Sequence, residues 1–551
     1  MLFDNFLEHK EKTALIDHNG EEISYKSLQD KVDDCSNRLG HEYRKLIFIK
    51  CSNNVESICF YVACLQSGHP VLLLNSENDS QNEEISMRYK PNVIVDASNA
   101  DVTIKLYHNK RIELHEDLAI LLSTSGSTGS PKLVKLSKKN ITSNTHSIIE
   151  YLGLNSFDRA ITSLKFSYSY GISIVNSHLQ VGGSIVLTEL SVSCSEFWTL
   201  VNTNNVTSFS GVPYSYEMLS KQKFNLSNYP SIRYLTQAGG KLSAPLVSEF
   251  SKKASILGIK FYVMYGQTEA SPRISYLPPK YTELYPDYIG LAVPGGELAI
   301  VDDEGNFINT PNQSGELVYK GPNIMMGYAL SPSELSVREE ITWLKTGDMG
   351  FKNEIGLFKI NGRKSRFSKP FGIRVNLDDI QNKLNEKSLT AAVTERKDII
   401  IIGVESDGND KRIEDMVHSI IQSEYNLHRS AVSIHQFEKL PLLPNGKFNY
   451  TKLAEYNREN ILTRFLKNFK EEILHLSGIK EHSWESMTQI FQYYFPDDCV
   501  NSQSSFISLA GDSLIYVSIS VEIEKYLTSL PDNWQSITVA SLEEMREKNE
   551  F

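Results

Sequence analysis

Residues 119–132 read AILLSTSGSTGSPK and join a short apolar strand, 119–122, to a loop rich in glycine and hydroxyl side chains. Glycine lets the backbone approach an anion closely, and hydroxyl and N–H groups can surround phosphate oxygens. Lys132 adds positive charge at the end of the loop. The run is not a Walker A loop, because Pro131 stands where that motif needs its second glycine. A phosphate loop and a flexible Ser/Gly surface loop are the two interpretations.

Apolar strands and amphipathic helices alternate on both sides of this run. Strands are predicted at 45–49, 70–74, 92–95 and 185–187, and helices at 57–67 and 140–152. This alternation predicts an α/β fold with largely parallel sheets. Beyond a turn-rich zone at 356–372, a further strand is predicted at 399–404, and helices at 412–425, 487–495 and 514–527.

Length and composition limit the class of protein. The 551 residues predict about three domains, and 40% hydrophobic with 22% charged residues is ordinary for a globular protein. No apolar run is long enough to span a bilayer, and the acidic N-terminus does not resemble a secretory signal, so we expect a cytoplasmic protein. The six cysteines form no C-x-x-C pair, which predicts reduced thiols rather than a zinc site.

The charge is negative and uneven along the chain. The net charge of −11 disfavours nonspecific nucleic-acid binding. Residues 484–551 carry 11 Asp and Glu against three Lys and Arg, yet they keep helical periodicity. This periodicity favours a folded acidic domain over a solvated acidic tail.

Residues 124–132 closely resemble the ATP loop of the adenylate-forming enzymes. That superfamily includes acyl-CoA synthetases, luciferases and the adenylation domains of nonribosomal peptide synthetases. The resemblance assigns to ATP the residues Thr124, Ser125, Gly126, Ser127, Thr128, Gly129 and Lys132.

The segment Tyr265-Gly266-Gln267-Thr268-Glu269 resembles the second signature of the family. In relatives the aromatic residue lies by the adenine, the threonine contacts the α-phosphate and the glutamate helps to hold Mg²⁺. Carboxylate and phosphate oxygens are the ligands that a hard cation prefers. The alternative for Glu269 is an acidic residue at the start of a helix.

Two further segments resemble parts of the nucleotide site. Gly239-Gly240-Lys241 resembles a strand end whose backbone lines the adenine pocket. Asp348, in Thr346-Gly347-Asp348, resembles the ribose-binding aspartate, which can accept hydrogen bonds from two vicinal hydroxyls; Arg363 follows and is assigned to the nucleotide. A solvated turn aspartate is the alternative for Asp348.

Lys447, at the end of Pro441-Leu442-Leu443-Pro444-Asn445-Gly446-Lys447, resembles the catalytic lysine of a small mobile domain. The resemblance implies that its ammonium bridges the attacking carboxylate and the α-phosphate, where negative charge develops. Without that context the lysine is a surface charge after a tight turn. Ser365 matches the hinge position, where relatives carry Asp or Lys, and Gly372 matches a glycine beside the pantetheine tunnel.

Residues 166–171, Phe-Ser-Tyr-Ser-Tyr-Gly, fall where relatives line the pocket for the acid. Peptide synthetase domains that select α-amino acids place an aspartate where this chain has Ser167. Because a buried ammonium without a counter-charge is costly, we expect an acid that lacks an α-amine: short acyl, hydroxy or aryl. Tyr168 and Tyr170 are assigned to the same pocket, with ordinary core packing as the alternative.

The segment Ser508-Leu509-Ala510-Gly511-Asp512-Ser513-Leu514 resembles the phosphopantetheine site of carrier domains, with Ala510 in place of a glycine. The resemblance implies that Ser513 carries 4'-phosphopantetheine as a phosphodiester at a helix N-terminus. An unmodified Asp-Ser N-cap is the alternative.

The resemblance implies an α/β core with mixed sheets at 1–361, a small mobile α+β subdomain at 362–456, a linker helix at 457–483 and a helical-bundle carrier domain at 484–551. It implies two reactions: a small carboxylic acid and Mg-ATP form acyl-AMP, and the thiol on Ser513 then takes the acyl group. Partners would be a phosphopantetheinyl transferase and a downstream acyl-accepting enzyme. The alternatives are a ligase that loads free CoA or a separate carrier, and a binding protein with a dead nucleotide site.

Overall fold

The computed structural model describes residues 2–108, 110–123, 132–368, 375–396, 399–406, 408, 410–425, 427, 431–442, 448–456, 484–495, 500–509 and parts of 519–549. These residues form two compact units, Met1–Ile360 and Asn361–Phe551. Within the described residues, no helix is both long and apolar enough to cross a membrane.

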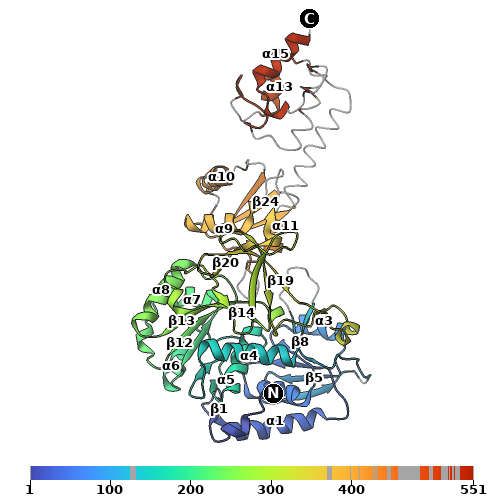
Figure 1. Cartoon of the computed structure of the whole chain (residues 1–551), viewed down its shortest axis with the longest axis vertical. Helices are drawn as coiled ribbons and strands as arrows, with labels where there is room; N and C mark the ends of the chain where they lie inside the picture. The colour runs from blue at the N-terminus through green and yellow to red at the C-terminus, as the bar shows by residue number, and fades with distance from the viewer. Residues whose placement is uncertain are drawn as a thin grey trace. The chain divides into compact units, whose positions relative to one another are not determined.

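A seven-stranded sheet lies in the first unit (Figure 1). Its strands, in spatial order, are β18 (Tyr328–Ala329), β8 (Leu133–Ser137), β7 (Leu118–Ser123), β4 (Val71–Asn75), β3 (Ile47–Cys51), β5 (Val93–Ala97) and β6 (Thr103–Leu106). The central strands β7, β4, β3 and β5 run parallel, and β18, β8 and β6 pair antiparallel at the two edges. The predicted strands 45–49, 70–74 and 92–95 are confirmed here, each within two residues.

Two smaller sheets of the first unit are mixed. One has the order β2 (Glu22–Ser24), β1 (Thr13–Ile16), β10 (Ser184–Val186) and β9 (Arg159–Ile161). The other has the order β11 (Ser208–Gly211), β12 (Tyr234–Gln237), β13 (Lys260–Gly266), β14 (Arg273–Leu277) and β15 (Leu291–Ala292). In the second of these sheets, β11, β12 and β13 are parallel and β14 and β15 are antiparallel.

A fourth sheet corrects the expectation of largely parallel sheets. Its order is β16 (Glu297–Val301), β17 (Gly315–Lys320), β19 (Leu344–Lys352) and β20 (Phe358–Arg363), and the β16–β17 and β17–β19 pairs are antiparallel. Parallel strands need long crossover connections, but no α-helix lies between these four strands. The α/β class with mixed sheets is confirmed.

The helices begin and end at residues that satisfy their free backbone groups. Ser137 and Asn140 form a capping box at the start of α4, and Gly153, at φ +66°, ends it. Asn54 caps α2 through the N–H of Ser57. The helices of the first unit are α1 (Tyr25–Leu39), α2 (Val55–Ser67), α3 (Asp79–Tyr89), α4 (Lys138–Leu152), α5 (Ser169–Gln180), α6 (Ser195–Thr203), α7 (Pro213–Lys221) and α8 (Ala244–Ile256).

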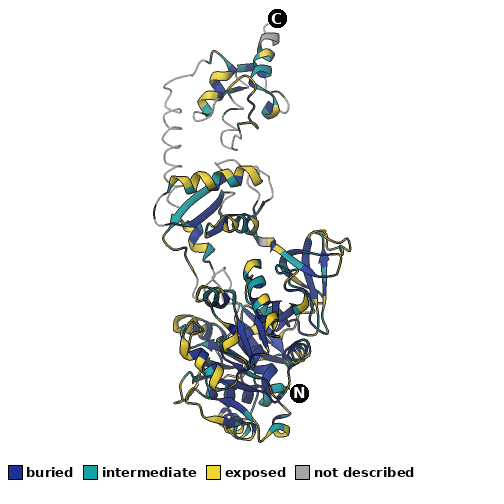
Figure 2. Cartoon of the chain, turned by 90° about the vertical axis from the view of Figure 1, so that its left-hand side faces the viewer, coloured by how far each residue is buried: buried dark blue, intermediate teal, exposed yellow. Residues whose placement is uncertain are grey.

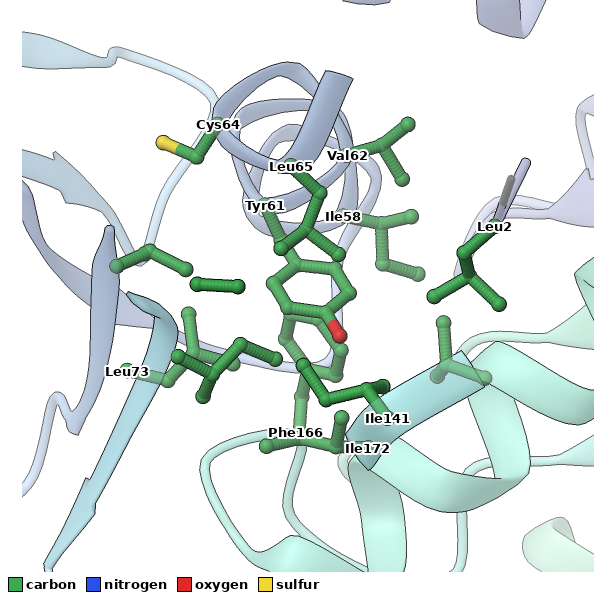
Figure 3. Close-up of a cluster of buried hydrophobic side chains, with 14 of the residues drawn as sticks. Leu2, Ile58, Tyr61, Val62, Cys64, Leu65, Leu73, Ile141, Phe166 and Ile172 are labelled. Carbon is green, nitrogen blue, oxygen red and sulfur yellow. The ribbon is translucent and has the colours of Figure 1, made fainter. Parts of the chain in front are cut away.

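Buried residues concentrate on the sheets and on the inward faces of these helices (Figure 2). In the largest cluster, Tyr61 of α2 packs edge-on against Phe166, with 5.3 Å between the ring centroids (Figure 3). Ile141 of α4 and Ile172 of α5 belong to the same cluster. The core therefore anchors the chain one residue before Ser167, the first residue assigned to the acid pocket.

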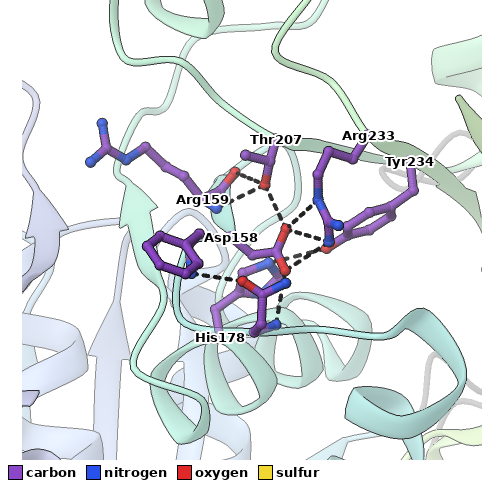
Figure 4. Close-up of polar contacts among 8 residues, drawn as sticks. Asp158, Arg159, His178, Thr207, Arg233 and Tyr234 are labelled. Atoms are coloured by element: carbon purple, nitrogen blue, oxygen red, sulfur yellow. Dashed lines mark hydrogen bonds and ion pairs between the residues drawn. The ribbon is translucent and has the colours of Figure 1, made fainter. Parts of the chain in front are cut away.

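A buried polar network ties the starts of β9, β11 and β12 together (Figure 4). The Asp158 side chain is fully buried, and Arg233 donates to it from Nε at 3.0 Å and Nη2 at 2.9 Å. The Thr207 hydroxyl donates to the same carboxylate at 3.0 Å. Since β12 runs from this network to Gln237, the ion pair helps to fix the strand that leads into Gly239 and Gly240.

The second unit contains a three-stranded sheet, β23 (Ala391–Arg396), β24 (Ile399–Glu405) and β25 (Val432–Phe437). Helices α9 (Leu377–Glu386), α10 (Lys411–Tyr425) and α11 (Tyr450–Glu455) accompany it. The same unit includes α13 (Met487–Tyr494) and α15 (Val539–Asn549), which share a separate hydrophobic cluster with Trp534. Cys35, Cys51, Cys59, Cys64 and Cys194 are free thiols, and Cys499 lies outside the described residues.

Candidate active site

The Tyr265–Glu269 segment leaves the end of β13 as a closed turn. A side-chain carbon on Gly266 would lie 2.0 Å from the carbonyl oxygen of Pro272, so only glycine fits there. The N–H of Gln267 donates to that same carbonyl at 2.8 Å. Thr268 then begins a short 3-10 helix, Thr268–Ala270. The chain thus holds the predicted phosphate and metal residues on a turn that folds back onto β14.

Tyr265 and Asp348 are in direct contact, although 83 residues separate them in the sequence. The Tyr265 hydroxyl donates to the Asp348 carboxylate, and Gln267 Nε2 lies 3.1 Å from the same oxygen. Gln267 also donates to the carbonyl of Thr346 at 2.8 Å. The structure therefore brings together the residues assigned to adenine and ribose. Asp348 is 3% exposed, which corrects its reading as a solvated turn aspartate.

Glu269 lies at the other end of the segment, close to Tyr328 of β18. Lys132, the residue before β8, lies next to Tyr328. The Glu269 carboxylate accepts a hydrogen bond from the Tyr328 hydroxyl at 2.7 Å. Lys132 Nζ lies 3.9 Å from the centroid of the Tyr328 ring. Burial and the negative charge of Glu269 raise the pKa of Tyr328, so this hydroxyl stays protonated and keeps donating.

Tyr328 was not predicted from the sequence. It lies on the two-residue strand β18, which pairs with β8 opposite Val134. No motif surrounds Tyr328 in the sequence, and the available signal was the glycine that precedes it. In the structure this glycine, Gly327, has φ +101°. Tyr328 acts through Glu269 and Lys132, so we regard it as a positioning residue.

The turn Gly239–Lys241 follows β12. Gly239 has φ +87°, and a side-chain carbon there would lie 2.8 Å from the Tyr168 hydroxyl. Gln237 Nε2 donates to the carbonyl of Gly240 at 2.8 Å, and Lys241 is exposed. The turn assigned to adenine and a tyrosine assigned to the acid pocket are therefore neighbours.

The three residues assigned to the acid pocket have different environments. Tyr168 is 38% exposed, whereas Tyr170 is 3% exposed and its hydroxyl lies 2.7 Å from Thr236 Oγ1. Ser167 is half-buried. Tyr170 thus fits the alternative of core packing, and Tyr168 and Ser167 are the residues of this set that remain accessible. Burial raises the pKa of the Tyr168 hydroxyl, which keeps it neutral.

The remaining predicted residues belong to the second unit or lie outside the described part of the chain. Arg363 ends β20, is exposed, and donates its backbone N–H to Asp378 at 3.1 Å. The backbone of Ser365 lies in a 3-10 helix, Lys364–Arg366. Outside the described residues lie Thr124, Ser125, Gly126, Ser127, Thr128, Gly129, Gly372, Lys447, Ser513 and the linker 457–483.

The donor set suits magnesium that binds together with a nucleotide. Among the described residues, no group of three or more His, Cys, Asp and Glu could hold a metal ion. Mg²⁺ commonly binds one or two carboxylates together with substrate phosphates and waters. Glu269, positioned by Tyr328, can supply such a carboxylate.

Comparison with known proteins finds one family match and several relatives. The sequence family described as AMP-binding enzyme matches residues 82–329. A 2-succinylbenzoate–CoA ligase from Bacillus pumilus is 26% identical over 82% of this chain and 97% of its own length. A D-alanine–D-alanyl carrier protein ligase from Listeria monocytogenes is 25% identical over 62% of this chain and 71% of its own length.

Solved structures share the fold. ATP-bound MatB from Rhodopseudomonas palustris has a TM-score of 0.70 and 20% identity, covering 83% of this chain and 98% of its own. The McyG A-PCP protein in complex with phenylalanyl-adenylate has a TM-score of 0.64 and 18% identity, covering 98% of this chain and 97% of its own. Residues 82–329 thus match a family of AMP-binding enzymes, and the chain is similar to CoA ligases and to a carrier protein ligase.

Proposed function

We propose that this chain activates a carboxylic acid with Mg-ATP as acyl-AMP and then transfers the acyl group to phosphopantetheine on its own Ser513. The observation that carries the nucleotide half is the contact of Tyr265 with Asp348, beside the Gln267 amide. An aromatic ring and a buried carboxylate held together can bind a base and a ribose at once.

Acid activation needs charge near the phosphates. Lys132 lies over the Tyr328 ring, and Glu269 accepts a hydrogen bond from the hydroxyl of the same tyrosine. Glu269 would hold magnesium against the phosphates, and Lys132, with the loop 124–129, would bind the phosphate oxygens. Magnesium neutralises the charge that develops as the carboxylate displaces pyrophosphate. Thr268 and the predicted lysine, Lys447, would complete this set at the α-phosphate.

Transfer to a carrier in the same chain rests on different support. The sequence around Ser513 resembles a phosphopantetheine site, and the fold likeness to the McyG A-PCP protein extends over 98% of this chain. A phosphopantetheinyl transferase would install the arm, and a downstream enzyme would accept the acyl group. The acidic composition of residues 484–551 would suit basic partner surfaces.

The relatives favour one alternative for the thiol. They include CoA ligases and a ligase that loads a separate D-alanyl carrier protein. This chain could likewise load free CoA or another carrier. Coexpression with a phosphopantetheinyl transferase, followed by intact-protein mass spectrometry, distinguishes the two. A pantetheine adduct on Ser513 that becomes acylated with acid and ATP supports loading in the same chain, and release of acyl-CoA without an adduct supports the alternative.

The first reaction is tested by ATP–pyrophosphate exchange over amino, hydroxy, aryl and fatty acids. We expect exchange with an acid that lacks an α-amine, because Ser167 offers no counter-charge to an ammonium. A strong preference for an α-amino acid would contradict this substrate assignment. No exchange with any acid would contradict acid activation.

A further inference from the structure

Arg273, the first residue of β14, carries a buried positive charge that the nucleotide site does not use. It is 3% exposed. Its Cζ lies 4.6 Å from the centroid of the Tyr170 ring, and Nη2 donates to Ser173 Oγ at 3.4 Å. Its Nε has no hydrogen-bond partner in the described structure. The guanidinium thus interacts with the Ser173 hydroxyl, the Tyr170 ring and the Tyr151 side chain, none of which is a carboxylate.

No carboxylate of the described residues forms an ion pair with Arg273. The buried acid Asp158 is paired with Arg233. The residues of the first unit outside the description, 1, 109 and 124–131, contain no Asp or Glu. A buried charge without a counter-charge is destabilising, and charged groups held in such surroundings are candidates for functional sites. An anion from outside the chain would supply the missing charge.

The position of Arg273 points to the acid as the source of that anion. It follows Glu269 by four residues on the turn that carries the nucleotide residues. It touches α5 at Tyr170 and Ser173, and the segment before that helix contains Ser167 and Tyr168. The Tyr168 hydroxyl in turn lies against Gly239. Arg273 therefore contacts the helix that begins directly after Ser167 and Tyr168, two of the residues assigned to the acid.

We infer that Arg273 is a specificity-determining residue that selects acids with a second anionic group, such as the distal carboxylate of a dicarboxylic acid. This inference rests on the proposed acid activation. A guanidinium can bind a carboxylate through two parallel N–H donors, including the free Nε. The same positive charge would repel a substrate ammonium, in agreement with the serine at position 167.

The test is ATP–pyrophosphate exchange with the whole chain and acids paired by carbon number: propionate and malonate, butyrate and succinate, hexanoate and adipate, benzoate and phthalate. In at least one pair we expect the diacid to give a tenfold higher kcat/KM, mainly through KM. Arg273→Met should abolish or reverse this preference, and Arg273→Lys should keep part of it. Arg338→Met, which removes an exposed arginine paired with Asp117, is the matched control and should leave the preference unchanged.

Thermal unfolding with the same acids shows whether each variant is folded. It also distinguishes failure of this inference from failure of the proposed acid activation. A diacid should raise the Tm of the wild type and of Arg338→Met but not of Arg273→Met. Exchange with monoacids at least equal to that with diacids, unchanged in Arg273→Met and Arg273→Lys, would overturn the inference and leave acid activation intact. If no acid supports exchange, the proposed acid activation is overturned. In that case, a diacid-specific Tm shift that depends on Arg273 would still support the inference about Arg273. Absence of that Tm shift would overturn the inference.

Discussion

Glu269, the proposed magnesium ligand, is held in place by two hydrogen bonds. The Tyr328 hydroxyl donates to one of its oxygens at 2.7 Å, and its backbone carbonyl accepts from the N–H of Met325 at 2.9 Å. Both contacts reduce the freedom of the side chain and its turn. Because folding already orders this side chain, the entropy cost of orienting it does not arise again when the substrate binds.

Glu269→Gln should therefore lower activity more than stability. The amide oxygen can still accept from Tyr328, but the negative charge that holds magnesium is lost. We expect the kcat of pyrophosphate exchange to fall by about 100-fold or more, with little change in Tm. Tyr328→Phe is the matched control, since it removes only the positioning hydrogen bond, and should cost about tenfold. Equal losses in the two variants would contradict the metal role of Glu269.

The sequence allowed roles to be proposed for some residues, but it did not predict the environments of others. Tyr265, Glu269 and Asp348 lie in motifs whose spacing is independent of the intervening loops, so they could be assigned before the fold was known. Tyr328 and Arg273 could not, because their importance depends on burial and on contacts between distant strands. Tyr170 was assigned to the pocket on alternation alone, which does not distinguish a pocket wall from the core.

At the scale of elements, the same limits apply to strands and helices. Central strands such as β3 and β4 are continuous apolar runs and were predicted within two residues. The antiparallel sheet of β16, β17, β19 and β20 was not predicted, because glycines and polar residues interrupt the apolar residues of β17, β19 and β20. Helix α4 begins two residues earlier than predicted, since Ser137 caps it.

The Asp158–Arg233 pair links the residue before β9 to the residue before β12, and these two strands belong to different sheets. Asp158→Asn should destabilise the first unit by about 3 kcal/mol, at the low end for breaking a buried pair because Arg233 is 47% exposed. Urea unfolding measures this as a lower midpoint with an unchanged slope. Asp117→Asn breaks the exposed pair with Arg338 and should cost less than about 1 kcal/mol. Similar costs would show that the buried pair has no special role.

His178 of α5 makes the same region sensitive to acid. It is 2% exposed, with Nδ1 2.9 Å from the Ile174 carbonyl and Nε2 3.2 Å from the Tyr234 hydroxyl. Burial lowers its pKa, so the folded protein holds the ring neutral. Because the unfolded chain binds the proton more readily, stability should be complete above pH of about 6.5 and fall below it.

His178→Gln should flatten this fall, reducing the slope of unfolding free energy against pH by up to about 1.4 kcal/mol per pH unit. Urea titrations between pH 5 and pH 8 would give the slope. His146→Gln replaces an exposed histidine on α4 and should leave the slope unchanged. An unchanged slope in His178→Gln would mean that other groups, such as His69, whose pKa burial also lowers, control the response.

At the scale of the whole molecule, the two proposed reactions make different demands on the second unit. Lys447→Ala should reduce pyrophosphate exchange by about 100-fold or more, since it removes a cation from the charge that develops at the α-phosphate. Transfer from supplied acyl-AMP should be spared, because that step does not form this charge. Lys439→Ala, an exposed lysine eight residues earlier, is the control and should exchange normally. Normal exchange in Lys447→Ala would remove the catalytic role from this lysine.

Ser513→Ala should give the opposite result. The proposed acid activation does not use Ser513, so exchange should match the wild type, whereas the acylated chain should disappear from the mass spectrum after treatment with the transferase, acid and ATP. Ser502→Ala, an exposed serine of the same acidic segment, should still be loaded.

Mixing Ser513→Ala with pantetheinylated Lys447→Ala tests whether the arm must belong to the same chain that activates the acid. Loading only by supplied acyl-AMP would mean transfer within one chain, because tethering raises the effective concentration of the thiol to about the millimolar range; loading between the two variants would mean that separate chains can cooperate.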